Sequence, residues 1–171
     1  AQFNVGLFVS SILSIAGALS MSLLLLNDWI IGIAAILGVL ITTIASLSTR
    51  YYAGMEGKPV KNIAKASNRG AALNLITGIS YGLQSPVLPV IVLMAVVVGV
   101  YTLSGNSLLA LVGVNIGTDL LITFIMAADA FGPIVDNAAG IAGMSQAEQG
   151  VIDKLSRLDS VGNTMKAITK A

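Results

Sequence analysis

The sequence predicts an all-α membrane protein, a polytopic bundle of transmembrane helices with about four full spans and the start of a fifth. Of its 171 residues, 56% are hydrophobic and only 10% are charged, whereas soluble domains carry about 25% charged residues. The mean hydropathy is +0.90. Residues 1–27, 29–49 and 70–118 contain no charged side chain, and each stretch can cross the hydrocarbon core, which takes roughly 20 apolar residues.

The first two spans are expected at residues 5–26 and 29–49, separated by the polar pair Asn27–Asp28. Trp29 opens the second span and is an aromatic residue suited to the membrane interface. Because the connection is so short, these two spans are expected to form a tight helical hairpin.

The third span is expected at residues 71–101, with a kink or break at Pro86 and Pro89. The fourth is expected at 107–131. It should kink or end near Pro133, because proline removes a backbone donor and clashes with the carbonyl four residues earlier.

The fifth span starts near Ser160 and is cut short at residue 171, so we expect residues 1–171 to be one membrane-domain fragment of a longer protein. Residues 50–70 and 145–159 are the polar intervals. By the positive-inside rule both are expected on the cytoplasmic side. The first interval carries one acidic residue, Glu56, against five basic ones: Arg50, Lys58, Lys61, Lys65 and Arg69.

Composition also excludes several classes of function. The net charge of +1 argues against a nucleic-acid surface, for which a strong basic excess is expected. Without cysteine or histidine, the chain has no disulfide, thiolate nucleophile, imidazole base or zinc site of the usual ligands. Carboxylate, amide and amine chemistry remains.

Carboxylates and amides gather in the stretch DAFGPIVDNA, residues 129–138. Asp129 and Asp136 are seven residues apart, so on a continuous helix they share a face about 10 Å apart. Asp136 and Asn137 could present oxygen ligands to Mg²⁺, which takes one or two carboxylates together with water and phosphate. The alternative is that they cap a helix after the proline break.

A second polar stripe lies in the stretch LDSVGNTMKAITK, residues 158–170. Asp159, Asn163, Lys166 and Lys170 fall at i, i+4, i+7 and i+11, which places them on one helix face. The amide can bind a hydrated metal, and the ammonium groups can meet phosphate or fill a monovalent-cation site. The alternative for the two lysines is snorkelling to the lipid headgroups.

Ionisable groups inside a membrane span mark ion or substrate sites by default. One hypothesis is therefore that the chain is a section of a secondary transporter or channel, in which Asp and Lys side chains form an intramembrane ion relay. Asp119 is a lone carboxylate that could instead pair with a helix outside this chain.

The two stretches closely resemble the membrane-integral pyrophosphatases, which are ion-pumping enzymes that hydrolyse pyrophosphate. The likeness runs from about residue 50, where RYYA and then KPV occur, to the end of the chain. Residues 1–49 are similar only in hydropathy and order. The resemblance implies a homodimer in a lipid bilayer, with remaining helices of the full-length chain completing an enzyme that uses Mg²⁺ and pyrophosphate.

The resemblance also implies roles for individual residues. Asp136 and Asn163 match metal-binding positions, and Lys170 matches a substrate-binding position. Lys166, with Thr169, matches the potassium-independent branch, in which a lysine supplies the cation itself. Members of that branch are similar to proton pumps rather than sodium pumps, so H⁺ is the expected ion. Supporting roles are expected for Asp129, Asn137 and Asp159.

The chain departs from the family pattern at Arg50, Ala139, Gly143 and Met165, and these departures leave the metal-binding residue types intact. Carboxylates that hold the attacking water would lie outside this fragment, so we expect it to be inactive alone. A divergent, non-catalytic paralogue is a further alternative.

Overall fold

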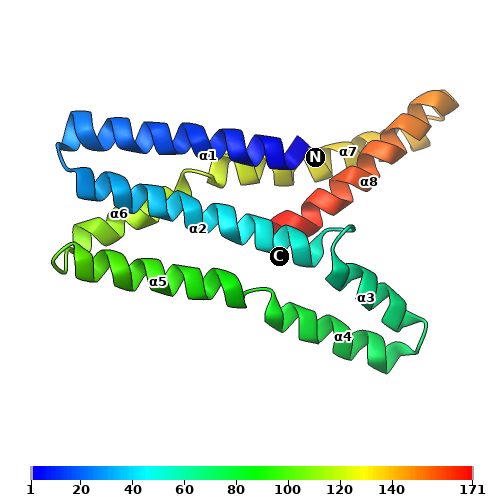
Figure 1. The fold of residues 1–171 in the computed structure, drawn as a ribbon. Helices are drawn as coiled ribbons and strands as arrows, with labels where there is room; N and C mark the ends of the chain where they lie inside the picture. The colour runs from blue at the N-terminus through cyan, green and yellow to red at the C-terminus, as the bar shows by residue number, and fades with distance from the viewer. Residues whose placement is uncertain (1, 171) are drawn as a thin grey trace.

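The regular structure of the chain is helical throughout the part that is described. The computed structural model describes residues 2–170, with side chains for residues 3–169. Within these residues the regular elements are the helices α1 to α8 and one π-helical turn, η1 (Figure 1). Four helical stretches are long and apolar enough to cross a membrane: Phe3–Leu26, Trp29–Ser67, Ala71–Leu103 and Leu108–Met144. The predicted all-α, polytopic class is confirmed.

The chain begins with the expected hairpin, formed by α1 (Gln2–Met21), η1 (Ser22–Leu26) and α2 (Trp29–Ala53). Asn27 adopts a left-handed backbone, with a φ of 49°, and Asp28 caps α2 by accepting the amide of Ile30 at 2.9 Å. The polar pair between the spans therefore makes both the turn and the helix cap. Figure 1 shows α1 and α2 running side by side.

Residues 50–70, expected as a polar loop, are largely helical. α2 continues to Ala53, and α3 (Lys58–Ser67) follows after a short turn. Pro59 lies in the first turn of α3, where the missing amide breaks no helical hydrogen bond. Four of the five basic residues of this interval therefore lie on helices, Arg50 on α2 and Lys58, Lys61 and Lys65 on α3, and Arg69 lies in the turn that follows α3. One of them, Lys61, forms an ion pair with Glu56 at 3.0 Å.

The third apolar stretch is divided where the prolines predict. α4 (Ala71–Gln84) and α5 (Val87–Leu103) are separated at Ser85–Pro86. Pro89 lies in the first turn of α5, where proline is tolerated. Figure 1 shows the two helices end to end, with α5 alongside α2.

The next helix was expected to kink or end near Pro133, and it does not end there. α6 (Leu108–Asp119) and α7 (Ile122–Met144) are separated at residues 120–121, and α7 continues through Pro133. The interruption allows Leu121, whose side chain is 0% exposed, to pack against Leu7 and Val39. Such tertiary packing has no local sequence signal, whereas proline within membrane helices is often accommodated by neighbouring groups.

The final helix starts earlier than expected. α8 (Gln149–Lys170) is continuous, so residues 149–159 are helical and not a solvated loop before a helix at Ser160. Near its start, the amide of Gln149 donates to Asp153 across one turn, at 2.9 Å. Polar pairs at this spacing stabilise an exposed helix. The polar sequence of residues 149–159 is therefore compatible with a helix.

The centre of the bundle is the crossing of α2 and α6, which depends on small residues. A Cβ added to Gly117 would overlap the carbonyl of Ala35, and one added to Gly38 would overlap the carbonyl of Val114. Membrane helices approach closely at such positions. Buried side chains next to the crossing form one apolar cluster: Ala34, Ile41, Val100, Ala110 and Val114.

We expect Gly117→Ala to destabilise the full-length protein, because the added methyl collides with a backbone carbonyl of α2. Overpacking of this kind costs about 1–3 kcal/mol. A fall in the thermal unfolding midpoint in detergent would measure it. Gly99→Ala is the matched control, since a Cβ there meets nothing within 4 Å, and equal midpoints for both variants would contradict the close crossing.

Candidate functional site

The two motif stretches meet where α7 packs against α8. A Cβ added to Gly162 would lie 3.1 Å from the Cα of Gly132 and 2.5 Å from a methyl carbon of Val135. Val135 is itself buried, at 6% exposure. The glycines of the two motifs therefore bring the backbones together, as small residues do between membrane helices.

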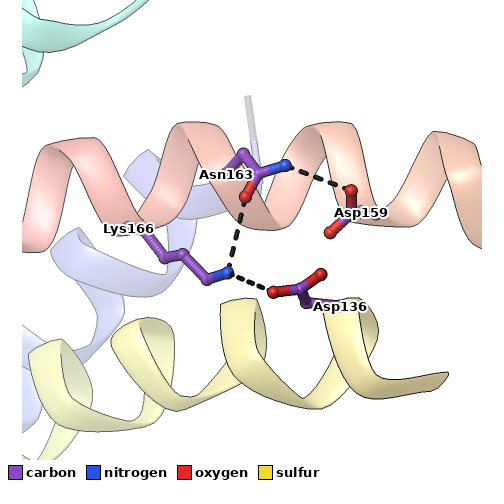
Figure 2. A network of polar contacts seen from close by, with 4 residues as sticks. All are labelled: Asp136, Asp159, Asn163 and Lys166. Atoms are coloured by element: carbon purple, nitrogen blue, oxygen red, sulfur yellow. Dashed lines mark hydrogen bonds and ion pairs between the residues drawn. The ribbon is translucent and has the colours of Figure 1, made fainter. Parts of the chain in front are cut away.

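Lys166 joins the two motifs through its ammonium group. Its Nζ donates to Oδ2 of Asp136 at 3.2 Å and to Oδ1 of Asn163 at 3.4 Å (Figure 2). The amide of Asn163 in turn donates to Oδ2 of Asp159 at 3.1 Å. The predicted metal ligands Asp136 and Asn163 thus lie on either side of one fixed positive charge.

The stem of Lys166 crosses the face of α7 at Gly132. A Cβ on that glycine would lie 2.5 Å from Cγ and 2.7 Å from Cε of the lysine. The lysine side chain is 23% exposed, whereas that of Asp136 is 62% exposed. The ammonium contacts polar groups of both helices, Asp136 on α7 and Asn163 on α8, so these contacts account for its position without the snorkelling alternative.

A second contact between α7 and α8 lies on the same faces. The hydroxyl of Thr169 donates to Oδ1 of Asp129 at 2.7 Å, which is shorter than its 3.0 Å distance to the carbonyl of Met165. Because Asp129 and Asp136 both contact α8, they share one face of α7, as their spacing predicts. The two contacts together fix the register of the helices.

The remaining predicted residues fall into different places. Asn137 is an exposed residue within α7, and the described contacts of this cluster do not include it. Asp136 and Asn137 lie in the interior of that helix, so the capping alternative is wrong. Lys170 ends α8, and its side chain lies outside the described residues.

The oxygen atoms of the cluster suit a partial magnesium shell. Oδ1 of Asp159 is buried and has no hydrogen-bond partner among the described residues, although buried carboxylate oxygens normally have one. Among residues 3–169 no group of three or more acidic, histidine or cysteine side chains is close enough to hold a metal alone. The residues present fit Mg²⁺, which binds one or two carboxylates and completes its shell with water and phosphate.

Sequence reasoning missed the role of Gly132 and Gly162. Each glycine lies within a stretch whose polar residues carry the chemical signal, and its own signal is only its small size. Their function depends on the opposite helix, which sequence spacing alone does not reveal. Because they have no side chain, they let the two helices approach until the polar side chains meet, and they make no polar side-chain contact themselves.

Gly132→Ala is expected to displace the aliphatic part of the Lys166 side chain and break its contact with Asp136, because the new methyl group would overlap Cγ of the lysine. In the full-length protein, amine acylation followed by peptide mass spectrometry should show faster modification of Lys166. Gly140→Ala, on the same helix but with nothing within 4 Å of its Cβ, should leave the rate unchanged. Equal rates in both variants would show that the stem does not depend on Gly132.

The whole chain is similar to one protein family. The family model "Inorganic H+ pyrophosphatase" matches residues 1–171, so the likeness also covers residues 1–49. A "K(+)-insensitive pyrophosphate-energized proton pump 2" of Moorella thermoacetica is 37% identical, covering 99% of this chain and 26% of the relative. Proteins called "K(+)-insensitive pyrophosphate-energized proton pump" are 41% identical in Caldanaerobacter subterraneus and 36% in Methanosarcina mazei.

The alignments cover most of this chain but only a small part of each relative. The Caldanaerobacter alignment covers 80% of this chain and 20% of the relative, and the Methanosarcina alignment covers 94% and 25%. The chain therefore spans about a quarter or less of the length of these curated relatives. Because the family model matches residues 1–171 of this chain, the chain belongs to the inorganic H⁺ pyrophosphatase family.

Proposed function

We propose that this chain is part of a potassium-independent, proton-translocating membrane pyrophosphatase, which hydrolyses Mg-pyrophosphate and couples the reaction to proton transport. The observation that carries the proposal is the position of Lys166, whose ammonium lies between the carboxylate of Asp136 and the amide of Asn163. The names of the relatives, potassium-insensitive proton pumps, support the same assignment.

In this proposal Asp136, Asn163 and Asp159 contribute to holding Mg²⁺ with the substrate. When bound, Mg²⁺ would neutralise phosphate charge. Asp136 is open enough to meet a ligand, since its side chain is 62% exposed, while Oδ1 of Asp159 can accept a hydrogen bond from a metal-bound water. A buried acceptor of this kind orients the groups around a metal.

Lys166 supplies a permanent positive charge next to the phosphates. Ammonium groups form strong, charge-assisted hydrogen bonds with phosphate oxygens, and a tethered one takes the place of a free monovalent cation. Lys170, one turn further along α8, is proposed to bind substrate phosphate. The contact of Thr169 with Asp129 holds α8 in the register that points Lys166 at Asp136, so these two are positioning residues.

The rest of the site is proposed to come from helices of the longer protein, because residues 3–169 contain no cluster of three acidic side chains that could hold a metal. The fragment alone is therefore expected to be inactive. The intact enzyme is proposed to be a homodimer in the lipid bilayer, with residues 50–70 and 145–159 on the cytoplasmic side, where the basic residues of α3 lie.

Asp136→Asn in the full-length enzyme should reduce Mg-dependent pyrophosphate hydrolysis by roughly 100-fold or more, since groups that stabilise transition-state charge are worth about 10²–10³ in kcat. The substitution preserves size but removes the charge. Asp153→Asn is the control, because Asp153 lies on the exposed start of α8 and bonds only to Gln149 in the described contacts. Normal turnover in Asp136→Asn would refute the metal assignment, and absence of hydrolysis in the wild-type enzyme would refute the proposed function.

Lys166→Ala should create a requirement for K⁺, because a free cation must then fill the space left by the ammonium. Hydrolysis measured against K⁺ concentration should be flat for the wild-type enzyme and should rise to saturation for the variant. Lys154→Ala, which removes a lysine from the solvent-exposed start of the same helix, should stay flat. A Lys166→Ala enzyme that is indifferent to K⁺ would rule out the cation-substitute role.

A further inference from the structure

Asp119 lies deep within a membrane-spanning stretch. It is the last residue of α6, in the candidate span Leu108–Met144. From Leu108 to Asp119 the helix rises about 17 Å, at 1.5 Å per residue. The hydrocarbon core is about 30 Å thick. With Leu108 taken as one boundary of that core, this distance puts Asp119 near its middle.

The neighbouring helix gives a second measure of the same depth. The hydroxyl of Thr42 on α2 donates to the carbonyl of Thr118 at 3.1 Å, so Asp119 lies close to the level of Thr42. Along α2, Thr42 is about 20 Å from Trp29 and about 12 Å from Arg50. Both measures place the carboxylate well away from either polar boundary.

Among the side chains that the structure describes, those of residues 3–169, Asp119 has no basic partner. Residues 1–49 and 70–153 contain neither lysine nor arginine. The contact described for its carboxylate is with the amide of Asn115, at 3.4 Å from Oδ2, and both residues are exposed on the surface of α6. A negative charge in the middle of a bilayer is costly, and the C-terminal end of a helix dipole repels it further.

The titratable side chains of the neighbouring helices lie towards helix ends. α6 packs against α2 and α5. On these helices they are Arg50, Tyr51 and Tyr52 at the last turn of α2, and Tyr101 near the end of α5. Among the described residues, α2 and α5 therefore place no lysine or arginine at the level of Asp119.

The backbone around Asp119 is also of the kind found at ion sites. The helix is interrupted at residues 120–121, directly after the carboxylate. Interrupted membrane helices frequently carry the ion sites of transporters, because they place helix ends and free carbonyls at membrane depth. In this arrangement Asn115 donates to Oδ2, and the described hydrogen bonds include none to Oδ1.

We propose that Asp119, with Asn115 as its hydrogen-bond donor, is an intramembrane proton-binding site that the Mg-pyrophosphate site does not include. The reaction is the reversible addition of one proton to Oδ1, from carboxylate to carboxylic acid. Its use in pumping rests on the proposed function, whereas proton binding itself does not. In the pump, Asp119 accepts and releases the transported proton as Asn115 holds its second oxygen.

Carbodiimide labelling tests whether the carboxyl is protonated. In the full-length wild-type enzyme in membranes, without substrate, dicyclohexylcarbodiimide should form an adduct at Asp119, because the reagent partitions into the bilayer and reacts with neutral carboxylic acids. Peptide mass spectrometry locates the adduct, which should be absent in Asp119→Asn. Asp153, on the solvent-exposed start of α8, is the unlabelled control. An unmodified wild-type Asp119 would overturn the proposal and indicate an ionised carboxylate paired with a cation from another helix.

Transport measurements test the role in pumping. Asp119→Asn should lower the number of protons pumped per pyrophosphate hydrolysed several-fold while hydrolysis continues, and Asp119→Glu should restore the ratio. An unchanged ratio in Asp119→Asn would overturn the role in pumping. If the wild-type enzyme hydrolyses no pyrophosphate, the proposed function fails, and the labelling result still decides whether Asp119 binds a proton.

Discussion

The candidate site depends on the close packing of α7 against α8 at Gly132 and Gly162. Two backbones that approach this closely leave no room for a Cβ on either side, so polar groups placed above and below the crossing are forced to meet. The ion pair of Lys166 and Asp136 (Figure 2) follows from it. The hydrogen bond of Thr169 and Asp129 follows from it as well. A looser crossing would leave two separate polar faces, each costly at the edge of a membrane.

The helical class and the polar faces could be predicted from the sequence, because both follow from local properties. Apolar stretches of span length predicted the membrane helices, and the spacing of Asp129 and Asp136 correctly predicted one shared face. Helix ends were less predictable. The helix was expected to kink or end near Pro133, yet it is interrupted at residues 120–121, where the side chain of Leu121 is buried against α1 and α2.

The polar start of α8 illustrates the same limit from the other direction. Its low hydropathy suggested a loop, but hydrophobicity reports which solvent a segment meets rather than whether it is helical. Pairs such as Gln149 and Asp153 stabilise a helix in water. As a result α8 is one rigid element that begins in a polar segment and ends beside α2 (Figure 1), so a displacement at the polar end would be transmitted to the position of Lys166.

The covalent attachment of the Lys166 ammonium has a consequence for how such a site responds to its surroundings. A free ion occupies a site in proportion to its concentration and leaves it at a finite rate. A tethered cation has a high effective concentration at its partner, so its occupancy does not vary with the ionic composition of the cell. In the proposed enzyme, the rate of hydrolysis would then depend on the pyrophosphate concentration and not on the K⁺ concentration. Regulation of the rate by K⁺, which an exchangeable ion would provide, is lost.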